Sequence, residues 1–172
     1  LELPVFLYTF PVLRRLDISG NSVNELNSEL GGLVSLTSLA FADNLLDELP
    51  LELGLLTNLQ HLAWRGNRLR LPPEIGDGEM SVRTPTYNQL GADKAVRYFD
   101  RLLKASSRHM LLLDNFGLCA FPHEVMRLST LTELSLKANS LRKLPPNIGE
   151  LPYLKKFNLE NNELETVHPA VG

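Results

Sequence analysis

Leucine and other large apolar residues recur along this chain with a spacing that repeats every 23 residues. The clearest copy starts at Leu131, and the next copy starts at Leu154. The template of this copy is L-x-x-L-x-L-x-x-N-x-L-x-x-L-P-x-x-I-G-x-L. A period of this length is typical of arrays in which each repeat stacks on its neighbour and buries a shared core.

The template fits the chain six times. The copies begin at Leu13, Leu36, Leu59, Arg108, Leu131 and Leu154, and residues 1–12 fit the end of an earlier copy. The third and fourth copies start 49 residues apart, so 26 extra residues interrupt the array. We therefore expect one repeat block over 1–75, an inserted loop and helix over 76–107, and a second block over 108–172, all in one continuous domain.

Two apolar positions in each copy, such as Leu134 and Leu136, alternate with residues that face the other way. This alternation predicts a short strand, and stacked copies predict a parallel sheet. Proline and glycine break the return segment, as at Pro145 and Gly149, so it should be a short helix, a 3₁₀ turn or extended chain. The predicted fold is an α/β solenoid, a curved right-handed array with the parallel sheet on its concave face.

One column of the repeat contains asparagine in five of six copies. The asparagines are Asn21, Asn44, Asn67, Asn139 and Asn162. Where the chain turns off a strand, a side-chain amide can bond backbone groups that the turn leaves unpaired. The fourth copy has Phe116 in this column, which indicates irregular packing after the insertion.

The insertion contains a helical pattern from Gly91 to Ser106. One side of this helix is apolar and contains Ala95, Val96, Tyr98, Phe99, Leu102 and Leu103, and another is basic and contains Lys94, Arg97, Arg101 and Lys104. The basic side is a possible secondary site for an acidic protein, calmodulin or anionic lipid. The alternative, which we favour, is that the apolar side packs on the repeats and the basic side is only solvated.

An outward column of the predicted sheet tests whether the strands continue through the insertion. Its residues are Ser19, Ala42, Arg65, Asp114, Lys137 and Glu160. If the insertion loops out, charges of opposite sign become neighbours from Arg65 onward. This alternation predicts one continuous sheet in which Arg65 lies beside Asp114.

The repeated Leu-Pro and Ile-Gly pairs resemble those of intracellular leucine-rich repeat proteins of the 23-residue L-P-x-x-I-G type. Leu144-Pro145 and Ile148-Gly149 show the pattern most clearly. The chain is similar to Ras-suppressor proteins and plant intracellular Ras-group-related repeat proteins. The resemblance implies a repeat solenoid that binds other proteins and has no shared set of catalytic residues.

Composition narrows the kinds of partner and the compartment. The formal charge of −3 gives no general attraction to nucleic acid or anionic membrane. Cys119 is the only cysteine and no Asn-x-Ser/Thr sequence occurs, which together favour an intracellular, cytoplasmic setting. No apolar run approaches the roughly 20 residues of a spanning helix.

We find no residue pattern for catalysis, a cofactor or a metal. The four histidines stand at no metal-ligand spacing and pair with no Ser or Cys in a catalytic frame. Cys119 follows a core leucine, so we expect a passive, partly covered thiol. The chain is therefore predicted not to be an enzyme.

The predicted protein-binding site is the concave face of the sheet. Its residues are Arg15, Asp17, Ser38, His61, Arg65, Met110, Leu112, Asp114, Glu133, Ser135, Lys137, Lys156, Asn158 and Glu160. Met110 and Leu112 form an apolar spot among charged residues, as at the centre of a protein contact. The alternative for this face is a polar surface whose charges pair only with one another.

The function predicted from this face is that of a scaffold or adaptor that binds a protein partner, in intracellular signalling. The other interpretation is the recognition or targeting segment of a larger enzyme, such as a GTPase, kinase or ubiquitin ligase, with the chemistry outside these residues. Both ends of the chain lack a polar cap. We therefore expect a fragment that self-associates through its ends or is marginally stable.

Overall fold

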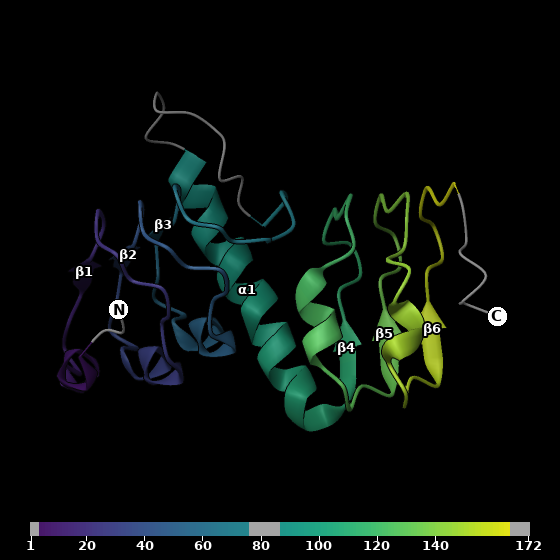
Figure 1. Cartoon of the computed structure of the whole chain (residues 1–172), viewed down its shortest axis with the longest axis horizontal. Coiled ribbons are helices and arrows are strands. Elements are labelled where there is room, and N and C mark those ends of the chain that lie inside the picture. Colours follow the sequence, from purple (N-terminus) through teal and green to yellow (C-terminus); the bar gives the residue numbers. More distant parts are fainter. Residues whose placement is uncertain (1–3, 76–86, 166–172) are drawn as a thin grey trace. The chain divides into compact units, whose positions relative to one another are not determined.

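The computed structural model describes residues 4–75 and 87–165 (Figure 1). The chain forms two compact units. Unit 1 consists of the described residues of Leu1–Arg70 and Ile75–Asp100, and unit 2 of those of Leu71–Glu74 and Arg101–Gly172. Each unit contains three short parallel strands, so each is described by itself below.

In unit 1 the strands are β1 (Arg15–Asp17), β2 (Ser38–Ala40) and β3 (His61–Ala63), in that order in the sheet. In unit 2 they are β4 (Met110–Leu112), β5 (Glu133–Ser135) and β6 (Lys156–Asn158). Residues one period apart are register partners, as for Leu16 with Leu39 and Leu134 with Phe157. The predicted strands and their parallel pairing are confirmed.

The return segments are short 3₁₀ helices, as the proline and glycine pattern predicts. They are η1 (Val5–Thr9), η2 (Ser28–Gly32) and η3 (Leu51–Leu55) in unit 1, and η4 (His123–Arg127) and η5 (Ile148–Glu150) in unit 2. Their inward side chains, such as Leu30, Leu53 and Val125, are completely buried. The core of each unit thus lies between the strands and the 3₁₀ helices.

Each column asparagine bonds the backbone of its own repeat and, from the second repeat of a unit onward, that of the preceding repeat. Asn139 Oδ1 accepts from the N–H of Leu118, and its Nδ2 donates to the carbonyls of Leu113 and Leu136. Asn44 makes equivalent bonds to Val23, Ile18 and Phe41. These bonds satisfy backbone groups at the turn after the strand, as the sequence predicts.

The inserted helix α1 (Tyr87–Arg108) is longer than the predicted range and packs closely on η3. A β-carbon at Gly54 would overlap the backbone N of Asp100 in α1. One repeat earlier, a β-carbon at Gly31 would lie 2.8 Å from Cβ of Glu52 in η3. Helix α1 therefore packs on η3 in the same way as η3 packs on η2 one repeat earlier.

The prediction of one continuous sheet is wrong. Strands β1–β3 and β4–β6 form two separate sheets, so Arg65 and Asp114 are not neighbours in one sheet. Two features explain the break. Helix α1 takes the place of the next return segment in unit 1, and Phe116 has no amide with which to bond the repeat before it.

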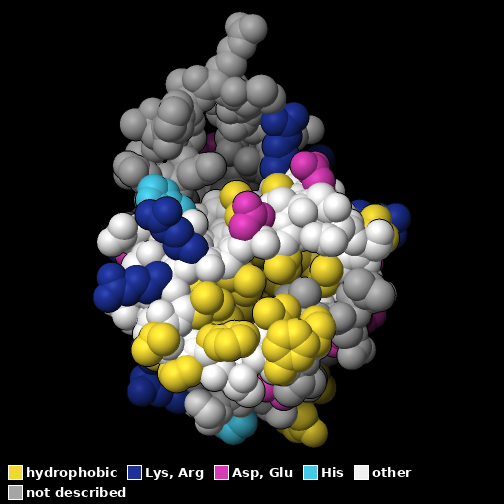
Figure 2. Space-filling view, turned by 90° about the vertical axis from the view of Figure 1, so that its left-hand side faces the viewer, with side chains coloured by type: hydrophobic (Ala, Val, Ile, Leu, Met, Phe, Trp, Pro, Cys, Tyr) yellow, Lys and Arg dark blue, Asp and Glu magenta, His cyan; other side chains and the backbone are white. Residues whose placement is uncertain are grey.

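The described residues before Leu13 include exposed apolar side chains. Phe6, Phe10 and Val12 are 61%, 46% and 81% exposed. Figure 2, which views the left-hand side of Figure 1, shows apolar side chains gathered across the middle of the face.

Candidate functional site

The predicted site residues of unit 2 lie side by side on the strand face of its sheet. Register pairing places Met110, Glu133 and Lys156 in one row across the strands. Leu112, Ser135 and Asn158 form a second row. Asp114, Lys137 and Glu160 follow two positions after the ends of the strands. Backbone hydrogen bonds continue there, from Leu113 N to Ser135 O and from Ala138 N to Glu160 O.

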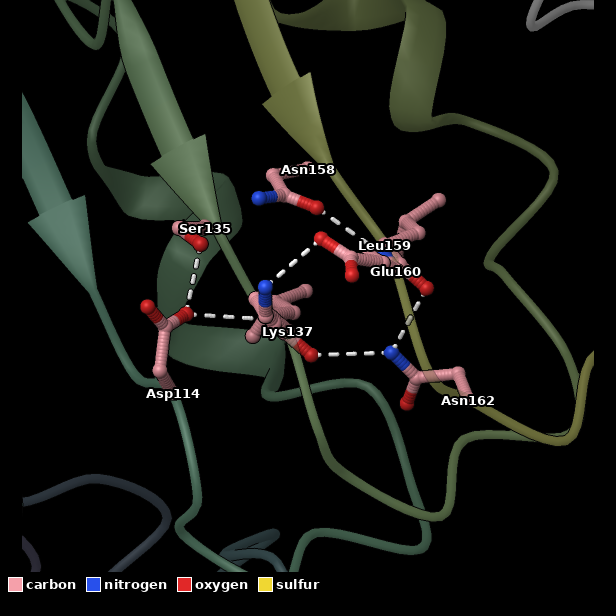
Figure 3. Close-up of polar contacts among 8 residues, drawn as sticks. Asp114, Ser135, Lys137, Asn158, Leu159, Glu160 and Asn162 are labelled. Carbon is pink, nitrogen blue, oxygen red and sulfur yellow. Dashed lines mark hydrogen bonds and ion pairs between the residues drawn. The ribbon is translucent and has the colours of Figure 1, made fainter.

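A chain of polar contacts connects the three repeats of unit 2 across this face (Figure 3). Asp114 Oδ1 accepts from Ser135 Oγ at 2.5 Å and from the backbone N of Lys137 at 3.0 Å. The Lys137 ammonium instead pairs with Glu160 Oε2 at 2.7 Å. Asp114 therefore contacts the neighbouring repeat through the Ser135 hydroxyl and the backbone N–H of Lys137. The alternation of charge predicts that Asp114 and Lys137 are neighbours, but it does not predict these two hydrogen bonds.

A second ion pair crosses the first row. Lys156 Nζ lies 3.2 Å from Oε2 of Glu133, the residue opposite it in the register of β5 and β6. Lys156 is exposed and Lys137 is half-buried, and each of these surface ion pairs contributes at most about 1 kcal/mol to stability. The main effect of these contacts is to hold long polar side chains in defined positions on the face.

Met110 and Leu112 of β4 differ from this polar surface because they are apolar and their side chains are partly exposed to solvent. Their exposed fractions are 42% and 37%. Between them, Leu111 points inward and is completely buried. Strand β4 therefore presents an apolar pair beside the ordered polar rows of β5 and β6.

The predicted residues of unit 1 form a separate and more polar strand face. Arg15, Ser38 and His61 are register partners, and Asp17 stands in the next row with two alanines. The carboxylate of Asp17 accepts a hydrogen bond from the N–H of Ser19 at 2.9 Å. This backbone hydrogen bond, with a further one from the Ser19 side chain, lowers the pKa of Asp17. Arg65 follows β3, where its carbonyl accepts from Asp43 N.

Helix α1 buries its apolar side. Val96, Tyr98, Phe99 and Leu102 are buried, and the rings of Tyr98 and Phe99 meet edge to face at 5.4 Å. This burial confirms that the apolar stripe packs within the protein.

The basic side of the helix faces solvent. Arg97, Arg101 and Lys104 are exposed and Lys94 is half-buried. Arg97 pairs with Asp93 at 2.8 Å, which reduces the net positive charge of this side. Binding of an acidic partner by these residues stays a prediction.

The single thiol makes a contact that its sequence position did not reveal. Cys119 is exposed, not partly covered as expected, and its Sγ donates to Glu74 Oε1. This hydrogen bond to a carboxylate favours the neutral thiol and raises the pKa of Cys119. The two residues are 45 positions apart on different sides of the insertion, so no local pattern connects them.

Metal binding and membrane spanning are two other functions that can be compared with the described residues. No three His, Cys, Asp or Glu side chains in the described ranges are placed to hold a metal ion. Within the same ranges, no helix has both the length and the apolar character needed to cross a membrane.

Comparison with known proteins places the chain in a structural class. It is 39% identical over 69 residues to leucine-rich repeat protein 1 of Mus musculus, an alignment covering 40% of this chain and 14% of the relative. It is 30% identical over 172 residues to the human (Homo sapiens) volume-regulated anion channel subunit LRRC8D, covering 99% of this chain and 18% of the relative. A solved leucine-rich repeat protein of Leptospira interrogans is 25% identical, with a TM-score of 0.41, over 99% of this chain and 43% of that one. No protein-family model matches the chain.

The repeated strand, asparagine and 3₁₀ helix, together with the similarity to these leucine-rich repeat proteins, define the fold as a leucine-rich repeat α/β solenoid. The chain spans less than a fifth of the length of either of these two relatives. The more specific resemblance to Ras-suppressor proteins stays a prediction.

Proposed function

We propose that this chain is a non-enzymatic protein-binding segment whose contact surface is the strand face of unit 2. The observation that carries the proposal is the exposure of Met110 and Leu112 beside ordered polar rows. Exposed apolar side chains next to ordered polar groups are typical of protein contacts.

The polar contacts of this face favour binding for an energetic reason. A flexible lysine or glutamate loses rotamer entropy when a partner immobilises it. Here Lys137 is held by Glu160, and Lys156 by Glu133, before any partner arrives. Part of the ordering cost is thus already met in the free protein, and a partner with both apolar and charged groups suits the face.

A comparison of two surface variants tests this proposal. The double variant Met110→Glu/Leu112→Glu adds charge to the apolar pair at positions that already face solvent, so the fold should persist. The matched control is Tyr153→Glu, at a 60% exposed residue in the segment between η5 and β6. Proteins crosslinked in cells to the wild-type chain should be retained by the control and lost by the double variant.

Retention of every partner by the double variant would reject the strand face of unit 2 as the contact surface. Loss of partners by both variants would point to a general effect on folding. Far-UV circular dichroism of each variant separates these cases, because a folded double variant that keeps its partners contradicts the proposal directly.

A second candidate function is recognition within a larger protein that performs another activity. It is favoured by the short coverage of the two relatives, 14% and 18% of their lengths. A channel subunit such as LRRC8D contains a similar segment, and an enzyme could do so equally. In that case the partner bound by Met110 and Leu112 is the molecule on which the larger protein acts or by which it is regulated.

A further inference from the structure

Asp114 is the acidic side chain of the strand face of unit 2 that has no cation beside it. Glu133 pairs with Lys156 and Glu160 pairs with Lys137, so both lysines of the face already have an acidic partner. No lysine, arginine or histidine of the described residues lies within ion-pair distance of the Asp114 carboxylate. The face therefore carries one negative charge that no described residue neutralises.

The chain itself holds this carboxylate in a defined position. Its Oδ1 accepts from the Ser135 hydroxyl at 2.5 Å and from the backbone N–H of Lys137 at 3.0 Å. Ser135 is buried, which anchors the contact. The other carboxylate oxygen, Oδ2, accepts no hydrogen bond from the described residues, and Figure 3 shows it pointing away from Ser135 and Lys137. Because Asp114 is only half-buried, a donor of a partner can reach Oδ2 while both contacts of Oδ1 persist.

The apolar pair of the face lies next to this carboxylate along the same strand. Leu111 and Leu113 point inward and are completely buried, so Met110, Leu112 and Asp114 face outward together. The rise of a strand places the Cα atoms of Met110 and Asp114 about 13 Å apart, with Leu112 midway. An extended partner segment of about five residues can thus contact the apolar pair and the carboxylate at the same time.

The opposite end of this column has the opposite charge. Arg108 and His109 come directly before β4, and both are exposed. Arg108 is the last residue of α1, so the strand alternation that places Asp114 beside Leu112 does not extend to it. A cationic group of a partner is repelled by Arg108 and attracted by Asp114. The two ends therefore orient a bound segment with its basic residue at the Asp114 end.

We propose that the partner segment bound by the strand face of unit 2 carries a lysine or arginine that pairs with Asp114, next to apolar side chains that cover Met110 and Leu112. The inference rests on the proposed protein-binding function and names the chemistry of its partner. A charge that a contact buries without a partner charge costs affinity. A segment without the cation would leave Asp114 in this state, so the carboxylate discriminates between partners.

Peptide selection on the 172-residue chain tests this partner chemistry. The probe is a phage-displayed library of random peptides. Peptides that need the apolar pair are identified by their loss on Met110→Ala/Leu112→Ala, which truncates the pair without adding charge. We expect these peptides to contain a lysine or arginine beside apolar residues.

Asp114→Asn should weaken the binding of these peptides about tenfold. The Oδ1 atom of the asparagine can still accept from Ser135 and Lys137, so this variant removes the charge and keeps the anchoring contacts. Far-UV circular dichroism checks that its fold is unchanged. Glu150→Gln, at an exposed position in η5, is the matched control and should bind the peptides like the wild type.

A change in the peptide separates a direct ion pair from a general effect. Replacing the basic residue of a selected peptide with glutamine should weaken binding to the wild-type chain about tenfold. The same replacement should hardly change binding to Asp114→Asn, because the charge that the basic residue contacts is already gone. Isothermal titration calorimetry measures the four dissociation constants of this cycle.

The outcomes distinguish this inference from the proposed function. Peptides that need Met110 and Leu112 but bind Asp114→Asn as tightly as the wild type would overturn the inference and leave the protein-binding function in place. Equal losses from the glutamine replacement on both chains, or equal weakening by Glu150→Gln and Asp114→Asn, would do the same. A selection in which no peptide needs the apolar pair would reject the strand face of unit 2 and with it both proposals.

Discussion

At the scale of single residues, the asparagine of the repeat column stabilises the fold through hydrogen bonds to the backbone. Asn139 is 7% exposed and bonds backbone groups of Leu113, Leu118, Leu136 and Lys137. Buried backbone groups that lose a partner cost more free energy than the bond itself contributes. The column asparagines therefore stabilise the stacking of successive repeats within each unit.

Asn139→Ala should lower the free energy of unfolding by about 2–4 kcal/mol, because several buried backbone groups lose their partners. Asn21→Ala is the matched control from the same column. Asn21 is exposed and donates only to Ile18 and Ser19 of its own repeat, so its loss should cost less than about 1 kcal/mol. Urea unfolding measures both, and equal costs would contradict this role of the buried amide.

The Cys119–Glu74 contact gives a prediction about pH. The carboxylate of Glu74 stabilises the neutral thiol, so the pKa of Cys119 is raised and less thiolate is present at mildly alkaline pH. Glu74→Gln removes the negative charge, which should lower the thiol pKa toward its ordinary value. The alkylation rate with iodoacetamide at pH 8 should therefore increase, and its pH profile should move to lower pH. An unchanged profile would show that Glu74 does not control the thiol.

At the scale of elements, strands and return segments follow from the sequence, whereas the break between sheets does not. Leu134 and Leu136, which are two residues apart in the repeat, predict a strand. Proline at the start of the return segment keeps the 3₁₀ helix that follows it short. The sequence also predicts α1 and its buried stripe. These features depend on local periodicity, which one sequence reports directly.

The break between the two sheets cannot be predicted from the column of exposed charges. Alternating charges through Arg65 and Asp114 favoured continuity, yet exposed ion pairs contribute little free energy. Phe116 in the asparagine column is the signal against continuity, since its side chain has no amide with which to bond the preceding repeat. A buried hydrogen-bonding column constrains strand stacking more strongly than an exposed charge column.

The close approach of α1 to η3 can be tested at Gly54. Gly54→Ala places a methyl group against the backbone of Phe99 and Asp100, which cannot yield as a flexible side chain would. We expect a loss of about 1–3 kcal/mol in unfolding free energy. Gly32→Ala, where a β-carbon meets nothing within 4 Å, is the control and should be neutral or slightly stabilising. Hydrogen exchange should show faster opening of α1 in Gly54→Ala only.

At the scale of the whole molecule, helix α1 is the described element that belongs to both units. The boundary between the units lies between Asp100 and Arg101, inside the continuous helix. In a repeat array, stability passes between nearest neighbours. The described strands form a separate sheet in each unit, so we expect coupling between the units to depend on the continuity of α1.

Arg101→Pro tests this coupling at an exposed position in the middle of α1. Proline removes a helix hydrogen bond and clashes with the preceding turn, at a cost of about 3 kcal/mol or more. We expect thermal unfolding to separate into two transitions, with hydrogen exchange at β1–β3 and β4–β6 diverging. Arg101→Ala removes the same charge but preserves the helix, and should keep a single transition. If Arg101→Pro also unfolds in one step with both sheets exchanging together, the units are coupled by something other than the helix backbone.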